Sequence, residues 1–505
     1  MLKRLGEAEI SGHPQANCEV VDTFIAGLPA DDAVRASQEI VQWFDTLNGE
    51  GKLPLAQRFE AIDRVDAALK RYGQRLLDQY LALKPQAKFQ EGLIWRTASA
   101  LWKALGESYI DCINEAVDDM SAAGSKRLTQ SVVRAMRAQV LQIKWTLLRY
   151  GHVSESYWAT LGRLYAHAEA GGFIDKVLEI YPGAHGQGTV RQEFLRTLML
   201  GVSSTGGLSP VKQHIAERAI AHFSKDFVSS EAEQEGCNFV FDMAGTAAPT
   251  RVYAALPKTA RLFYFGAGAA LEAAQAVIDK VGETGVLPLD MGVQQVAADD
   301  AADTLLHLAF NWEKELPARD SERVKVAMTL QVTQGFEGAL VGGESTLREV
   351  WVVENASEEG YGVIVPPRRG EWLQVGVLIG FKPDAEGTTW GAAIVRRVET
   401  DARGQRRVGL QVISRGSASG TLCAIRSGGQ RGAPQSVVFL DWQPSKSGYL
   451  QILVRPDSFT SLDTLEATRT ADGKTFMLTA SGTVETGPDF ERVRFKHQAP
   501  AAASA

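Results

Sequence analysis

Cysteine is scarce in this sequence of 505 residues, which contains only four. Cys18, Cys112, Cys237 and Cys423 lie far apart and form no CxxC pair, so they predict neither a structural zinc site nor a disulfide framework. Isolated thiols are typical of a reducing compartment, where a buried cysteine acts as a small apolar residue.

Long apolar runs are also missing. No stretch of about 18 apolar residues occurs, so we expect no membrane insertion. The first nine residues lack the apolar core of a signal peptide. Together with the isolated thiols, these features predict a soluble cytoplasmic protein.

Positive charge is not in excess, because 53 Lys and Arg face 60 Asp and Glu and the formal net charge is −7. Binding to a nucleic acid backbone by overall charge needs clustered Lys and Arg. We therefore expect no DNA or RNA partner. The composition still leaves room for a small anionic ligand in a locally basic pocket.

Motifs for catalysis and for metal binding are missing as well. The eight histidines form no HExxH pattern, and no GxSxG elbow occurs, so we expect neither an enzyme nor a bound metal or cofactor. One turn, Gly266-x-Gly268, follows an expected strand at residues 261–265, but Leu271 occupies the place of the third glycine of a dinucleotide-binding turn. A nucleotide-cofactor enzyme that uses the Gly266–Gly268 turn stays open as an alternative.

The N-terminal part of the chain has a helical pattern. Phe59, Ile62, Val65 and Leu69 are spaced by three or four residues and form one apolar stripe. Several such stripes in series predict a bundle or a stack of helices over residues 1–230.

A mixed connecting region is expected at residues 231–314. Within it, short strands are predicted at residues 238–242 and 261–265, and helices at residues 269–281 and 297–312.

The C-terminal part consists of short β-runs bounded by Gly, Pro, Asp and Ser, which is typical of a barrel or sandwich. We expect a β-barrel at residues 315–420, and further strands at residues 421–497 that either extend it or form a second β-unit. The tail at residues 498–505 is predicted to be disordered. The expected fold class is α+β multidomain, with a mainly helical N-terminal region followed by the barrel.

Two short motifs lie near the start of this β-region. The first is an RxxxR pattern, and after about thirty residues the second follows, an NxSxxG pattern directly after an expected strand. Their defining residues are Arg319 and Arg323, then Asn355, Ser357 and Gly360. The ordered pair resembles the PilZ domain, a small β-barrel that binds cyclic di-GMP, and the resemblance covers roughly residues 316–420.

The residue types suit such a ligand. A guanidinium is a planar fork of donors that can bind a guanine edge or a phosphate at two points. Asn355 and Ser357 form turns and bond to backbone groups, and Gly360 permits positive φ or a close backbone approach. The resemblance therefore implies a ligand site formed by Arg319, Arg323, Asn355, Ser357 and Gly360.

Further charges lie near this site. The paired arginines 368–369, 396–397 and 406–407 are possible auxiliary contacts, although paired arginines often only protect a strand edge. Asp320, Glu322, Glu358 and Glu359 place negative charge beside an anionic ligand. A scaffold or interaction protein with a degenerate barrel that binds no nucleotide therefore stays open.

The resemblance also implies a role. A bacterial effector of this family would convert cyclic di-GMP binding at the junction of helices and barrel into altered binding of an unidentified protein partner by the helical region. It would regulate motility, type IV pili or surface behaviour.

Overall fold

The computed structural model describes most of the chain in two compact units. The first unit is Met1–Thr205 with Pro210–Pro317, and the second is Gly206–Ser209 with Ala318–Ala505. The described residues are 18–49, 53–83, 87–118, 126–181, 186–252, 261–293, 296–315, 322–340, 348–366, 372–384, 389–425, 430–460 and 464–498. Arg319 and the tail after Gln498 lie outside them.

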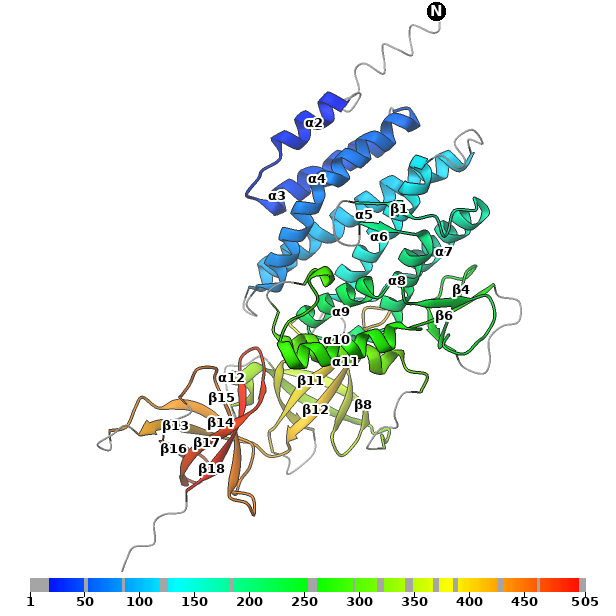
Figure 1. The fold of residues 1–505 in the computed structure, drawn as a ribbon. Helices are drawn as coiled ribbons and strands as arrows, with labels where there is room; N and C mark the ends of the chain where they lie inside the picture. The colour runs from blue at the N-terminus through cyan, green and yellow to red at the C-terminus, as the bar shows by residue number, and fades with distance from the viewer. Residues whose placement is uncertain are drawn as a thin grey trace, which may run out of the picture. The chain divides into compact units, whose positions relative to one another are not determined.

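The first unit is mainly helical, and in Figure 1 its helices α3 to α6 lie side by side. Its helices are α2 (Cys18–Gly27), α3 (Ala33–Asn48), α4 (Leu55–Leu81), α5 (Lys88–Asp118), α6 (Lys126–Leu147), α7 (Glu155–Ala170), α8 (Val190–Val202), α9 (Pro210–His222), α10 (Ala270–Thr284) and α11 (Ala298–Trp312). The expected stripe of α4 is its packing face, because Phe59, Ile62, Val65 and Leu69 are all buried. No helix in the described part of the chain is long and apolar enough to cross a membrane.

Short strands complete the first unit. The pair β1 (Leu178–Glu179) and β2 (Gln187–Gly188) precedes α8, and the 3-10 turn η2 (Leu289–Met291) lies in the same unit. The 3-10 turn η1 (Thr205–Gly207) has its last two residues in the second unit. A four-stranded antiparallel sheet has the order β3-β6-β4-β5, from β3 (Val228–Ser230), β4 (Phe239–Asp242), β5 (Thr250–Arg251) and β6 (Leu262–Gly266).

This sheet argues against a dinucleotide-binding turn at Gly266–Gly268. Such a turn joins parallel strands through a helix, whereas β6 pairs antiparallel with both β3 and β4. A Cβ on Gly266 would lie 1.9 Å from the carbonyl oxygen of Gly236, and Gly268 has φ of +54°. Glycine is therefore required at these two positions by close backbone contact and by positive φ. Binding of a cofactor is not needed to explain it.

The second unit contains two closed antiparallel barrels of six strands. The first has β7 (Met328–Gln334), β8 (Glu349–Ala356), β9 (Gly360–Val365), β10 (Leu378–Pro383), β11 (Gly391–Thr400) and β12 (Arg406–Ser414), with α12 (Gly335–Ala339) after β7. The second has β13 (Ala418–Ile425), β14 (Gln435–Phe439), β15 (Tyr449–Val454), β16 (Thr464–Arg469), β17 (Thr475–Thr486) and β18 (Glu491–His497). The expected α+β multidomain fold is confirmed. The strands after residue 421 belong to a separate closed barrel.

The two barrels have the same topology. In each, the first three strands form a meander, the third strand pairs with the sixth, and the fourth strand closes the barrel on the first. An apolar cluster joins the barrels, with Phe336 and Ile394 of the first packed with Leu440 and Phe490 of the second. A carboxylate oxygen of Asp489 also accepts a hydrogen bond from the backbone N–H of Phe336 at 2.7 Å. This shared core accounts for the two barrels belonging to one compact unit.

Candidate functional site

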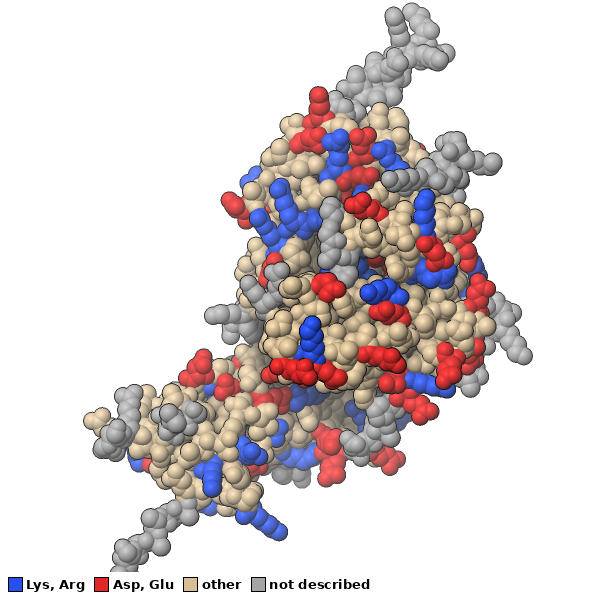
Figure 2. All heavy atoms as spheres, in the orientation of Figure 1, with Lys and Arg blue, Asp and Glu red and all other residues tan. Residues whose placement is uncertain are grey.

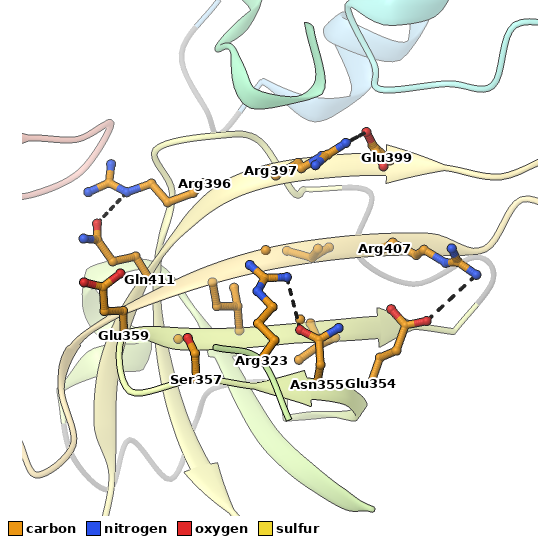
Figure 3. A pocket seen from close by; sticks show the side chains of 16 residues that line it. Arg323, Glu354, Asn355, Ser357, Glu359, Arg396, Arg397, Glu399, Arg407 and Gln411 are labelled. Carbon is orange, nitrogen blue, oxygen red and sulfur yellow. Dashed lines mark hydrogen bonds and ion pairs between the residues drawn. The ribbon is translucent and has the colours of Figure 1, made fainter. Parts of the chain in front are cut away.

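A pocket of about 780 Å³ lies on the first barrel, over strands β8, β9, β11 and β12 (Figure 3). This volume lies within the range of about 300–1,000 Å³ that is typical of small-molecule sites. Its lining is mainly polar and charged: Arg323, Glu354, Asn355, Ser357, Glu359, Gly360, Gly362, Val363, Arg396, Arg397, Glu399, Arg407, Val408, Gly409, Leu410 and Gln411. The pocket therefore includes four of the five residues that the sequence motifs single out.

The segment that leads into the barrel brings the two motifs together. Val324 and Ala356 exchange backbone hydrogen bonds, each of 2.9 Å, so this segment pairs with the end of β8. This pairing places Arg323 beside Asn355, and Nη1 of Arg323 donates a hydrogen bond of 3.1 Å to Oδ1 of Asn355 (Figure 3). The two residues are 32 positions apart in the chain.

The turn between β8 and β9 holds the rest of the second motif. The backbone N–H of Ser357 donates to the carbonyl oxygen of Gly360 at 2.9 Å and closes the turn. Gly360 is needed for close approach and not for positive φ, because a Cβ there would lie 1.9 Å from the carbonyl oxygen of Leu410. Gly362 has a related role that the sequence analysis missed. A Cβ on it would lie 2.6 Å from Oδ1 of Asn355, so glycine leaves space for that side chain.

Arg415, which the sequence analysis also missed, fixes this turn. Its Nη2 donates to the carbonyl oxygens of Glu358 at 2.6 Å and Ser357 at 3.2 Å, and its Nη1 donates to the hydroxyl of Tyr361 at 2.8 Å. A single arginine after a strand carries no spacing signal, and its partners are backbone carbonyls that any sequence has. Only the folded barrel identifies it as a residue that positions the motif.

The other arginines of the pocket have carboxylate partners. Arg397 pairs with Glu399, and Nη2 of Arg407 lies 4.0 Å from the carboxylate of Glu354. Because both pairs are largely exposed, each contributes only about 0–1 kcal/mol. A more strongly charged ligand can therefore displace these carboxylates at little cost.

Arg396 is held more firmly. Its Nη1 and Nη2 contact the two carboxylate oxygens of Glu485 at 2.5 and 2.9 Å, and its Nε donates to the side chain of Gln411 at 2.8 Å. Glu485 belongs to β17, so the second barrel orients an arginine that lines the pocket of the first. Of the other paired arginines, Arg406 does not line the pocket, and residues 368–369 lie outside the described part of the chain.

Among the described residues, the face of the molecule in Figure 2 has no extended surface of positive charge alone. On the face shown in Figure 2, Lys and Arg lie interspersed with Asp and Glu. In the described part of the chain, no group of three or more His, Cys, Asp or Glu side chains could hold a metal ion. The pocket instead offers guanidinium, amide and hydroxyl groups, which suit the phosphates and guanine edges of a nucleotide.

Comparison with known families adds evidence from a different part of the chain. Residues 19–232 match the family model of the N-terminal domain of the cyclic-di-GMP receptor FimW. The resemblance to cyclic-di-GMP receptors is confirmed. This match covers the helices from α3 to α9 and none of the barrel strands that carry the two motifs. No curated protein matches the chain.

Proposed function

We propose that this protein is a cyclic di-GMP effector whose ligand site is the pocket of the first barrel. The observation that carries the proposal is the hydrogen bond between Arg323 and Asn355 at the edge of that pocket. It joins the two motifs that resemble the PilZ domain. The match of residues 19–232 to the N-terminal domain of a cyclic-di-GMP receptor supports the same ligand independently.

The ligand chemistry follows from the donors. A cyclic dinucleotide presents two anionic phosphates and the O6 and N7 acceptors of each guanine. Arg323, together with Arg319 of the same motif, binds these acceptors from the lead-in segment, and the adjacent turn at Ser357 supplies further polar groups. Arg397 and Arg407 exchange Glu399 and Glu354 for phosphate, because a ligand with two charges outcompetes a weak exposed ion pair.

The output lies in the helical region. Ligand binding adds contacts between the lead-in segment and the turn between β8 and β9, which the pairing of Val324 with Ala356 already joins, and this change alters how the helices bind a protein partner. The coupling is limited to the ligand's differential affinity for the two states, typically about 1–3 kcal/mol. The process regulated is motility, type IV pili or surface behaviour, and the protein acts in the cytoplasm.

Isothermal titration calorimetry of the full chain with cyclic di-GMP tests the proposal, with GTP and cyclic di-AMP as control ligands. We expect selective, saturable binding that weakens at least tenfold in Arg323→Ala and in Asn355→Ala. The matched control is Arg403→Ala, an exposed arginine in the turn between β11 and β12 that is not among the residues lining the pocket. It should bind like the wild type.

Two results would contradict the proposal in different ways. Wild-type affinity in Arg323→Ala would show that the ligand binds elsewhere. If titration of the wild-type chain with cyclic di-GMP gives no binding heat at two temperatures, Glu354 and Glu399 stay paired with Arg407 and Arg397. The barrel would then be a scaffold that binds no nucleotide.

A further inference from the structure

A second basic cavity lies inside the helical unit. It has a volume of about 320 Å³ and lies among α4, α5, α6, α8 and α9, which Figure 1 labels. Five cations from four of these helices line it: Lys70, Arg137, Lys144, Arg196 and Arg218. Glu217 is the one carboxylate among the described lining residues.

Part of this positive charge is balanced by a buried ion network. Glu217 accepts a hydrogen bond from Nζ of Lys144 at 2.8 Å and pairs with Arg196. Glu193 of α8, which is not among the lining residues, accepts from Nε of Arg137 at 2.9 Å. The capping box between Thr189 and Gln192 fixes the start of α8 and so holds the first turn that carries Glu193.

Two cations are left over. Among the described residues, no carboxylate lies within 4.0 Å of the charged nitrogens of Lys70 or Arg218. Nζ of Lys70 lies 2.9 Å from the centre of the Tyr181 ring, and Nε of Arg218 donates to the carbonyl oxygen of Met291 at 3.1 Å. Gly292, at φ +66°, leaves space for this guanidinium, because a Cβ there would lie 2.9 Å from Nη2 of Arg218.

Asp66, the acid that acts on the charge of Lys70, has other partners. Asp66 accepts hydrogen bonds from the hydroxyls of Tyr109 and Tyr181 at 2.9 and 2.8 Å, and Nε of Arg134 lies 3.9 Å from it. Arg134 has a closer partner in Asp63, at 2.6 Å, so Asp66 offsets part of the charge of Lys70 without forming an ion pair with it. With Arg134 counted, six cations face four carboxylates, Asp63, Asp66, Glu193 and Glu217, and about two positive charges stay in surplus.

Unsatisfied donors also line the cavity. Trp102 is 7% exposed and Arg196 is 6% exposed, and in the described structure neither the indole N–H of Trp102 nor Nε of Arg196 has a hydrogen-bond partner. A buried donor without a partner typically costs about 1–3 kcal/mol. His214, with Nδ1 2.8 Å from Nζ of Lys144, is the neutral neighbour, because burial lowers its pKa to about 3. The cavity lining would therefore be complemented by a ligand that carries negative charge and several hydrogen-bond acceptors.

We propose that this cavity binds a phosphomonoester dianion, in a site separate from the barrel pocket. Two negative charges match the two unpaired cations, and the three terminal oxygens of a phosphomonoester provide several acceptors for guanidinium, ammonium and indole donors. A volume of about 320 Å³ suits a ligand no larger than a mononucleotide.

Full-length protein in a phosphate-free buffer of low ionic strength tests this site by calorimetry and thermal unfolding. The probes are inorganic phosphate, GMP and, as a dianion without phosphorus, succinate. We expect phosphate and GMP to bind saturably and to raise the melting temperature, because a ligand that binds only the folded state stabilises it. Succinate should bind at least tenfold more weakly than GMP.

Matched variants locate the site. Lys70→Met and Arg218→Met keep side-chain volume and remove the unpaired charges, and each should weaken phosphate binding at least tenfold. The control Lys103→Met changes an exposed lysine of α5, and Arg323→Ala changes the barrel pocket; both should bind phosphate like the wild type.

Several outcomes would overturn the proposal. If phosphate does not stabilise the folded wild-type chain, the buried charges are only structural. Equal losses in Lys70→Met and Lys103→Met would mean nonspecific attraction, and succinate binding as tightly as GMP would reject phosphate as the recognised group.

The pH dependence gives a further test. Burial lowers the pKa of Lys70 to about 8; Asp66 opposes this shift, and Arg134 and Arg137 add to it. A phosphomonoester such as GMP becomes a dianion above about pH 6. The affinity for GMP should therefore rise through about pH 6 and fall as the pH passes about 8 and Lys70 loses its proton. This fall should be absent in Lys70→Met, and its persistence there would show that Lys70 does not contact the ligand.

Discussion

The first barrel, β7 to β12, and the second barrel, β13 to β18, close in the same order of strands. They also share the spacing of one turn. Asn355, Ser357 and Gly360 lie at the β8–β9 turn, and Gln443, Ser445 and Gly448 have the same spacing between β14 and β15.

The barrels use their arginines differently. In the second barrel, Arg469 is 1% exposed, pairs with Asp472 at 2.6 Å, donates to the carbonyl oxygen of Trp442 and stacks on the Trp442 ring. In the first, Arg397 and Arg407 lie at the surface with exposed partners. One topology therefore supports both a structural arginine and arginines that are available to a ligand, and the local burial decides which.

The largest effect that distinguishes the barrels is on stability. Arg469→Ala removes a buried cation that also packs against aromatic rings, and it should lower the free energy of unfolding by about 3 kcal/mol. Arg397→Ala removes an exposed pair and should change it by less than about 0.5 kcal/mol. Urea denaturation measures both, and similar values for the two variants would contradict the comparison.

The next effect concerns the turn of the first barrel. Arg415→Ala removes the donors that hold the carbonyl oxygens of Ser357 and Glu358, so the motif is less preorganised. We expect cyclic di-GMP binding to weaken about tenfold, or about 1.4 kcal/mol. Calorimetry measures this loss. An unchanged affinity would mean that the turn does not contribute to binding.

A smaller effect of opposite sign is expected from the carboxylates. The double variant Glu354→Gln with Glu399→Gln removes the groups that compete with the ligand for Arg407 and Arg397. Cyclic di-GMP affinity should rise about threefold at low salt, since exposed pairs are worth about 0–1 kcal/mol each. A decrease in affinity would show that these carboxylates position the arginines for the ligand.

The last variant changes the turn of the second barrel and is expected to leave cyclic di-GMP affinity unchanged. Gln443→Asn gives the second barrel the asparagine of the first motif in an Arg323→Ala background, but the RxxxR pattern that comes before β13, Arg403 to Arg407, belongs to the β11–β12 turn and to β12 of the first barrel. The variant should bind cyclic di-GMP no better than Arg323→Ala alone. Recovery of binding in the same titration would show that the turn is sufficient without the arginines.

The elements with strong periodicity were predictable from the sequence. The stripe of α4 and the strands at β14 and β15 are rich in large apolar residues, so their burial pattern is visible in the chain. Strand β13 gives a weaker signal, because Ala418, Ser419 and Gly420 resemble a loop. Gly420 is required there, since a Cβ would lie 2.5 Å from both the Phe439 ring and the carbonyl oxygen of Thr468.

The site was predictable only in part. Arg323, Asn355, Ser357 and Gly360 follow from motif spacing, and the structure brings them to one pocket. Their ligand-binding role stays a prediction. Arg415, Gly362 and Glu485 act through contacts between distant strands, which no local pattern encodes.

The most direct measurement is one titration of cyclic di-GMP into three proteins: the wild type, Arg323→Ala and Arg431→Ala. Arg431 is an exposed arginine of the second barrel that pairs with Glu466, and it serves as the matched control. We predict saturable binding to the wild type and to Arg431→Ala, with at least a tenfold loss in Arg323→Ala. Equal affinity of all three proteins, or a loss confined to Arg431→Ala, would contradict the assignment of the ligand site to the first barrel.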